Sequence, residues 1–172
     1  ISVSCSGGEA SLVSDICKNI SLKFPKFSKE KSTKISKTLG ELVKISNPLD
    51  YHTFIWGNQK KMNELFVAIC EKVNDLIIFV FDVPRNDRCD PTSFKCGIEA
   101  IIHAKKKTNA NIAVISSISE SMTEDLAEVF IKNQILPLGG LKTGLRAIEL
   151  SNKSFLFSKK VDFIKVLLEK RI

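Results

Sequence analysis

Short apolar runs alternate with amphipathic stretches along most of this chain. The run at 76–81, LIIFVF, is apolar at every position, which is typical of a strand covered on both faces of a parallel sheet. Shorter runs at 1–5, 112–115 and 135–138 predict further strands. A fifth predicted strand, at 22–24, stands directly before a proline.

Between these runs, apolar residues return every three or four positions, which predicts helices. The predicted helices cover 9–20, 28–39, 60–73, 92–107, 123–133 and 141–150. Ser28 is the predicted N-cap of the second helix and Gly40 its predicted end. Strands that alternate with helices predict an α/β fold, a flavodoxin-like doubly wound parallel sheet of five strands in three α/β/α layers.

The chain is predicted to hold one domain, 1–150, followed by a helix or linker, 151–172, that leads toward a following domain. Its 172 residues, 44% of them hydrophobic, suffice to bury a core. An apolar stripe predicts that 161–172 form a further amphipathic helix, with Phe163, Ile164, Leu167 and Leu168 on one side. The chain starts without Met, and we therefore expect it to be a piece of a longer polypeptide.

The formal net charge of +7 raises the question of a nucleic-acid partner. The lysines are spread along the chain and show no interleaving of Arg with aromatic residues, so a solvated lysine-rich surface is favoured and no nucleic-acid partner is predicted. An attraction for the phosphates of nucleotides or CoA stays open.

The cysteines are odd in number, five, and form no CxxC pair, which predicts reduced thiols and a cytoplasmic protein. They are Cys5, Cys17, Cys70, Cys89 and Cys96. The sequence contains no run of 18 apolar residues and no export signal, so no membrane partner is predicted.

The turn Ser6-Gly7-Gly8 joins the first predicted strand to the first predicted helix and is the best candidate for an anion-contacting site. Glycine permits positive φ and a close approach of the backbone, and the first N–H groups of a helix favour a phosphate or carboxylate. Ser6 could supply a hydroxyl donor or cap the helix. A plain tight turn is the alternative, and Glu9 in the first helical turn offsets part of the attraction for anions.

A second candidate lies in an expected ordered loop at 43–57. Asn47 and Asp50, on either side of Pro48 and Leu49, could orient a ligand or a mobile segment from a proline-stiffened loop. An Asx-type turn accounts for the same residues without a function.

The remaining polar candidates are weaker. His52 stands among aromatic residues, where a packed loop residue is favoured over a general base, and His103 is expected to be structural or solvated. The loop after the 76–81 strand is crowded with charges and is favoured to be a solvated, salt-bridged loop over a ligand site. Its charged residues are Asp82, Arg85, Asp87, Arg88 and Asp90. No metal-ligand cluster is visible in the sequence.

The spacing of two motifs brings in a family. SGGEAS at 6–11 follows the first predicted strand, and SNPLD comes at 46–50, ahead of three strand and helix units. This order resembles the last flavodoxin-like domain in the CoA-binding half of the NDP-forming acyl-CoA synthetases, such as ADP-forming acetate-CoA ligase, which are relatives of succinyl-CoA synthetase. The resemblance covers residues 1–150.

The resemblance implies a ligase that interconverts a carboxylic acid and its CoA thioester with ATP and ADP, through a phosphohistidine on a swinging loop. By this resemblance the start of the first helix is a phosphate-binding site, made of Ser6, Gly7, Gly8, Glu9 and Ala10. Asn47 and Asp50 match the family's Asn-Pro-x-Asp loop and are candidate loop contacts. Neither His52 nor His103 matches the phosphohistidine motif, so the catalytic histidine is expected on a preceding domain.

The whole enzyme is then expected to use CoA and ATP or ADP with Mg, with no cofactor assigned to this domain alone. Its partners would be the CoA-binding, phosphohistidine and ATP-grasp domains or subunits, and a homo-oligomer stays open. The isolated domain is expected to be inactive. The aromatic stretch 51–56 departs from the family and suggests a specialised branch. The alternative function is a non-catalytic, flavodoxin-like binding or regulatory module.

Overall fold

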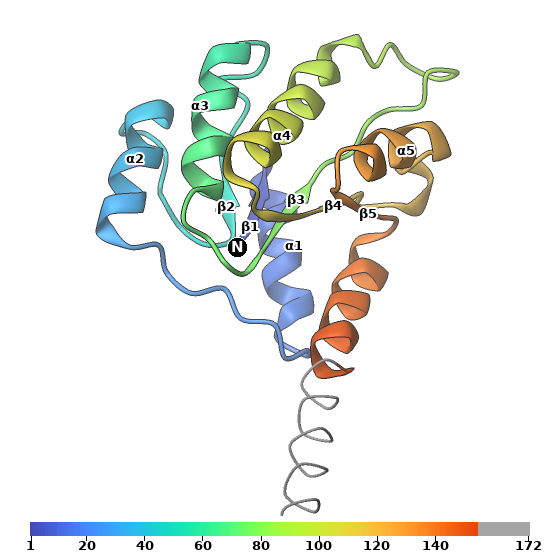
Figure 1. The fold of residues 1–172 in the computed structure, drawn as a ribbon, viewed down its shortest axis with the longest axis horizontal. Coiled ribbons are helices and arrows are strands. Elements are labelled where there is room, and N and C mark those ends of the chain that lie inside the picture. The colour runs from blue at the N-terminus through green and yellow to red at the C-terminus, as the bar shows by residue number, and fades with distance from the viewer. Residues whose placement is uncertain (155–172) are drawn as a thin grey trace, which may run out of the picture.

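A single sheet of five parallel strands forms the centre of the computed structural model, with helices on both of its faces (Figure 1). The strand order is β2-β1-β3-β4-β5, which is the flavodoxin-like order. The predicted fold class is therefore confirmed. The structure describes residues 1–154, and the amphipathic helix predicted at 161–172 lies outside the described residues.

The strands are β1 Ser2–Ser4, β2 Leu49–Asp50, β3 Leu76–Val80, β4 Asn111–Ile115 and β5 Leu136–Leu138. The α-helices are α1 Gly7–Cys17, α2 Lys29–Leu39, α3 Gln59–Cys70, α4 Lys95–Thr108 and α5 Glu124–Lys132. Short 3-10 turns cover Thr92–Phe94 and Ser119–Ser121, and 141–154 are also helical. None of the described helices has the length and apolar character needed to cross a membrane.

The fully apolar strand β3 divides its side chains between two cores, as expected for a strand with helices on both sides. Ile77 and Phe79 belong to the larger core, together with the buried faces of α2, α3 and α4. Ile78 and Val80 belong to the smaller core, where α1 and the helix at 141–154 cover the sheet. The run is apolar at every position because both faces of this strand are buried.

The helix boundaries follow the capping residues. The Ser28 side chain accepts a hydrogen bond from the Lys31 N–H, and Gly40 ends α2 with a φ of +85°. The predicted cap and the predicted end of this helix are both confirmed. The same device starts α5, where Thr123 accepts from the Leu126 N–H at 3.4 Å.

The second strand is not where the sequence predicts it. Residues 22–24 form no strand, and β2 lies instead at Leu49–Asp50, inside the stretch that we expected to be a loop. Leu49 is fully buried and pairs with Val3, and the Tyr51 N–H donates to the Ser4 carbonyl at 2.9 Å. A two-residue strand carries no periodicity of its own, so its pairing with β1 decides its structure.

Glu149 ties the last described helix to the segment that follows α1. Its side chain is only 2% exposed, accepts from the Ser21 N–H at 2.9 Å and pairs with Lys153 at 2.6 Å and with Arg146. The hydrogen bond from Lys153, then the one from the Ser21 backbone, lowers the pKa of Glu149 from 4.5 to about 2. The fold therefore favours the ionised form of this carboxyl group.

We expect Glu149→Gln to lower the thermal midpoint by several degrees at neutral pH, because the change removes the charge that Lys153 and Arg146 share. The native pKa lies below the ordinary value, so the contribution is present above 4.5 and is lost as the pH falls toward 2. Thermal unfolding of both proteins, followed by circular dichroism at neutral pH and near pH 2, measures this contribution to stability. Glu128→Gln removes an exposed pair with Lys132 and serves as the control, with little expected change.

Candidate functional site

The turn between β1 and α1 presents unpaired backbone donors at the carboxyl edge of the sheet. The Ser6 side chain caps α1 by accepting from the Gly8 N–H at 3.2 Å, and the Ala10 N–H donates to the Ser6 carbonyl at 3.1 Å. The described part of the chain supplies no acceptor for the N–H groups of Gly7 and Glu9. These donors, with the positive end of the helix dipole, are available to an incoming oxyanion.

Gly7 is needed for a close approach and not for a left-handed backbone. The glycines with positive φ are Gly40, Gly57 and Gly140, so the conformational freedom that the sequence suggested at the turn is not used. A Cβ on Gly7 would instead come within 3.2 Å of Oδ2 of Asp50. The SGG turn and the NPLD segment therefore meet, although they are far apart in the sequence.

Asp50 holds the loop after β2 against this turn. Its Oδ1 accepts from the His52 N–H at 2.8 Å, which is an Asx-type turn, and its Oδ2 lies 3.5 Å from His52 Nε2. His52 has a φ of +57° and stacks on Phe54 with ring centroids 5.2 Å apart. The Asp50 carboxylate thus faces the turn on one side and orders the loop on the other.

Glu9 has an environment that the sequence alone did not reveal. Burial, followed by the charges of Asp82 and Asp50, raises the pKa of Glu9 from 4.5 to about 7. Its Oε2 is buried and has no hydrogen-bond partner among the described residues. This carboxyl group in the first turn of α1 therefore divides between its neutral and ionised forms near pH 7, and only the neutral form can donate a hydrogen bond.

The Tyr51 hydroxyl group and the Cys5 thiol share the electrostatic environment of this carboxyl group. Tyr51 is 1% exposed, and within 1–154 its hydroxyl finds no hydrogen-bond partner. Burial raises its pKa, and Cys5 and Glu9 raise it further. Burial and then Glu9 raise the pKa of Cys5 to about 11, so its thiol is not activated as a nucleophile. Local sequence patterns did not mark Tyr51 as a site residue, because the strand β2 that precedes it was not predicted.

The other charged candidates divide between the site and the surface. Asp82, at the end of β3, accepts from the Ser117 N–H at 2.8 Å and contributes to the field at Glu9. Farther along the same loop, Arg85 and Asp87 form an exposed pair at 2.7 Å. Only the first residue of this charged loop belongs to the site.

Asn47 lies at the beginning of β1, away from the turn. Its Oδ1 accepts from the Ser2 N–H at 3.0 Å, and its Nδ2 donates to the Pro25 carbonyl at 2.8 Å. The side-chain amide is thus engaged with the backbone on both sides. Asp50 is the residue of the NPLD segment that the fold brings to the SGG turn.

His103 lies in α4, whose buried face shares the larger core with β3. Among residues 1–154, no group of three or more His, Cys, Asp or Glu side chains is arranged to hold a metal ion. The carboxyl edge therefore offers amides, hydroxyl groups and three carboxyl groups, those of Glu9, Asp50 and Asp82.

Solved structures of similar fold come from archaeal proteins. PH0766 of Pyrococcus horikoshii OT3 superposes with a TM-score of 0.63 at 17% identity over 82% of this chain. The dinucleotide forming acetyl-coenzyme A synthetase 1 of Candidatus Korarchaeum cryptofilum gives 0.57 at 14% identity over 83% of this chain, in its apo form. The same synthetase in complex with phosphate and ADP gives 0.58 at 15% identity over 83%.

This chain spans less than a third of the length of these proteins, 32% of PH0766 and 30% of the synthetase. No family model and no curated protein matches the sequence. At these identities the comparison establishes the flavodoxin-like fold, which agrees with the strand order observed here.

Proposed function

We propose that this chain is a domain of an NDP-forming acyl-CoA synthetase and that it helps to hold a phosphohistidine loop during the interconversion of a carboxylic acid and its CoA thioester. The similarity in fold to an acetyl-coenzyme A synthetase supports the class of enzyme. The observation that carries the proposal is the meeting of the two motifs, in which Asp50 of NPLD lies against Gly7 of SGG.

The edge would hold the phosphoryl group of a phosphohistidine through the backbone. The free N–H groups of Gly7 and Glu9 point out of the start of α1, where the helix dipole adds a positive potential. A neutral Glu9 would add a donor beside them. The carboxylates of Asp50 and Asp82 would face the imidazole ring and could accept a hydrogen bond from its N–H group.

The remaining components of the reaction would come from other domains or subunits of the enzyme. The synthetase of similar fold has been observed with phosphate and ADP. CoA, ATP or ADP with Mg, and the phosphohistidine itself, are assigned in this proposal to the domains outside this chain. The chain alone would bind and orient a phosphoryl group and would not turn over substrate.

Titration of the 15N-labelled protein with sulfate, at constant ionic strength, tests the anion site. We expect the amide signals of Gly7 and Glu9 to shift most, because their N–H groups have no acceptor among the described residues and an oxyanion at the start of α1 would accept from them. The amides of Gly8 and Ala10, which donate to Ser6, should shift less. The amides of the first turn of α5 provide an internal control, since Glu124 and Asp125 stand there and repel anions. A second titration with phosphoimidazole tests the phosphohistidine.

Shifts confined to the start of α1 with both ligands would support the proposal. Shifts with sulfate and none with phosphoimidazole would retain an anion site but contradict the phosphohistidine role. If neither ligand moved these amides, or if α1 and α5 responded alike, the site itself would be wrong.

A further inference from the structure

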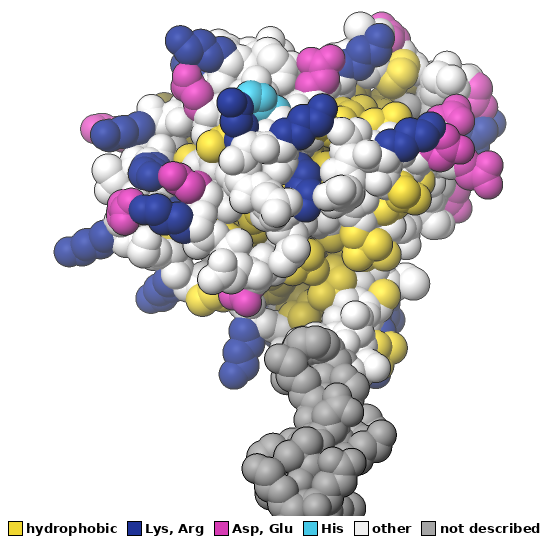
Figure 2. All heavy atoms as spheres, in the orientation of Figure 1, with side chains coloured by type: hydrophobic (Ala, Val, Ile, Leu, Met, Phe, Trp, Pro, Cys, Tyr) yellow, Lys and Arg dark blue, Asp and Glu magenta, His cyan; other side chains and the backbone are white. Residues whose placement is uncertain are grey.

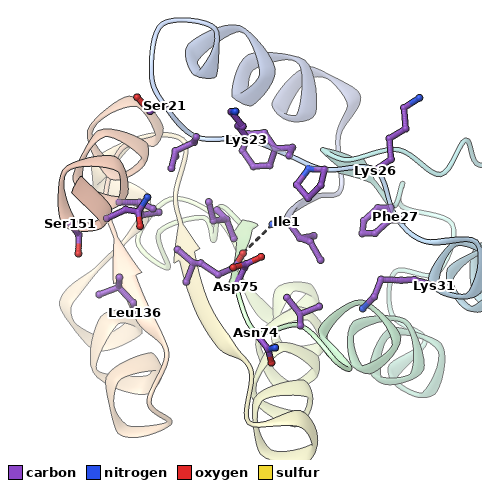
Figure 3. Close-up of a pocket in the computed structure, with 18 of the residues that line it drawn as sticks. Ile1, Ser21, Lys23, Lys26, Phe27, Lys31, Asn74, Asp75, Leu136 and Ser151 are labelled. Atoms are coloured by element: carbon purple, nitrogen blue, oxygen red, sulfur yellow. Dashed lines mark hydrogen bonds between the residues drawn. The ribbon is translucent and has the colours of Figure 1, made fainter. Parts of the chain in front are cut away.

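A groove lies at the amino edge of the sheet, opposite the site described above. Its volume is about 1320 Å³, and it runs between the segment that follows α1, the starts of the strands and the helix at 141–154 (Figure 3). Apolar side chains line most of it, among them Leu76, Ile78, Leu138 and Ile148. Figure 2 shows hydrophobic side chains gathered in a patch on this face of the molecule.

The rim of the groove is basic. Lys23 and Lys26 are exposed, and no carboxylate within 1–154 pairs with either of them. Lys72 also lines the groove, with Glu30 3.6 Å away. Asp75 is the one carboxylate among the described lining residues. The rim therefore presents uncompensated positive charge beside an apolar floor.

The size of the groove favours a polypeptide over a small ligand. Pockets for small molecules usually measure about 300–1,000 Å³, and this groove is both larger and open to solvent. Leu136 forms part of the wall of the groove, and its side chain is 49% exposed to solvent. An amphipathic helix laid into an apolar groove is a common mode of peptide recognition.

We propose that this groove binds an acidic, amphipathic helical segment of a partner polypeptide. The apolar stripe of the segment would cover Leu136 and the floor, and its acidic residues would pair with Lys23 and Lys26. Charge complementarity selects the acidic partner, because the lysines outnumber the single lining carboxylate. The inference does not depend on the function proposed for the opposite edge.

A fluorescein-labelled synthetic helical peptide, with Leu on one stripe and Glu on the opposite face, serves as the probe. Its binding to the full chain is followed by fluorescence anisotropy, beside a peptide in which Lys replaces every Glu. We expect the acidic peptide to bind and the basic one not to bind. Lys23→Glu with Lys26→Glu should weaken the binding of the acidic peptide roughly tenfold or more. Leu136→Asp should weaken it as much, because it places a charged side chain in the apolar wall.

Lys60→Glu with Lys61→Glu is the matched control, since these exposed lysines at the start of α3 give the same change in net charge. This pair should leave the affinity nearly unchanged. Equal losses from both pairs, binding of the basic peptide, or no binding of the acidic one would overturn the proposal. Displacement of the probe by a peptide of sequence 155–172 would also overturn it, in favour of that segment as the occupant.

Discussion

Replacement of Gly97 by alanine is expected to lower the free energy of unfolding by about 1–3 kcal/mol, the usual cost of overpacking a core. Gly97 lies in α4 directly over Phe81, and a Cβ there would come within 2.5 Å of both Cε2 and Cζ of that ring. Alanine has a higher helix propensity than glycine, by about 1 kcal/mol. The expected loss of stability would therefore be observed despite this gain in helix propensity.

Phe81 has little room to move away from such a methyl group. It is 3% exposed, and the centroid of its ring lies 6.0 Å from that of Trp56 and 6.1 Å from that of Phe94. Its displacement would also disturb Asp82, the next residue, which reaches the candidate site. A packing change in α4 is therefore expected to be felt at the carboxyl edge.

Urea denaturation of the wild type and Gly97→Ala measures the effect. Gly8→Ala is the control, because a Cβ on Gly8 would lie an ordinary 3.4 Å from Ser6 Oγ. Combining Gly97→Ala with Phe81→Leu should recover part of the loss, since the smaller side chain yields space. A Gly97→Ala protein as stable as the wild type would contradict the packing described here.

Much of this fold could be predicted because long elements carry their own pattern. The apolar run that became β3 and the capped helix α2 were both located from local sequence. Residues 22–24 were predicted as a strand on the same local grounds, and wrongly, because their apolar side chains line the groove instead. The pairing of Leu49 with Val3, which decides β2, links residues that no periodicity connects.

The candidate site was predictable in part, for a similar reason. Two glycines after a strand pointed to the start of α1, but the physical role of Gly7 depends on Asp50, which only the fold brings near. From its position in the first helical turn, Glu9 was expected to offset part of the helix dipole, and the family resemblance placed it in the phosphate-binding set. Its raised pKa arises from burial and from Asp82, a residue of a different strand end, so no local window of sequence contains the cause.

Glu9 is expected to make oxyanion binding at the start of α1 depend on pH. Its pKa is raised from 4.5 to about 7, so the carboxyl group is neutral and can donate at lower pH, and is ionised and repulsive at higher pH. Sulfate affinity should fall about tenfold as the pH rises through this range, which corresponds to ~1.4 kcal/mol of lost attraction. Sulfate keeps its charge over this pH range, so the change in affinity would arise from titration of the protein.

Glu9→Gln should bind sulfate with little dependence on pH, because glutamine is always a neutral donor. The amide shift of Gly7, whose N–H has no acceptor among the described residues, provides the measurement in both proteins. Glu124→Gln is the matched control, since Glu124 is an exposed residue in the first turn of α5. A pH dependence that survived in Glu9→Gln would assign the titration to another group.

The same shift has a consequence for folding that can be measured without any ligand. A carboxyl group whose native pKa is raised favours the folded state least when it is ionised, so stability declines as the pH rises from 4.5 through about 7. Glu9→Gln should therefore raise the thermal midpoint at alkaline pH and leave it nearly unchanged below 4.5. A stabilising effect of equal size at both pH values would mean that Glu9 is strained by packing. An effect confined to alkaline pH would show that the fold holds the ionised carboxylate beside Asp82 and Asp50 at a cost in stability. Such a cost is expected of a group kept there for binding.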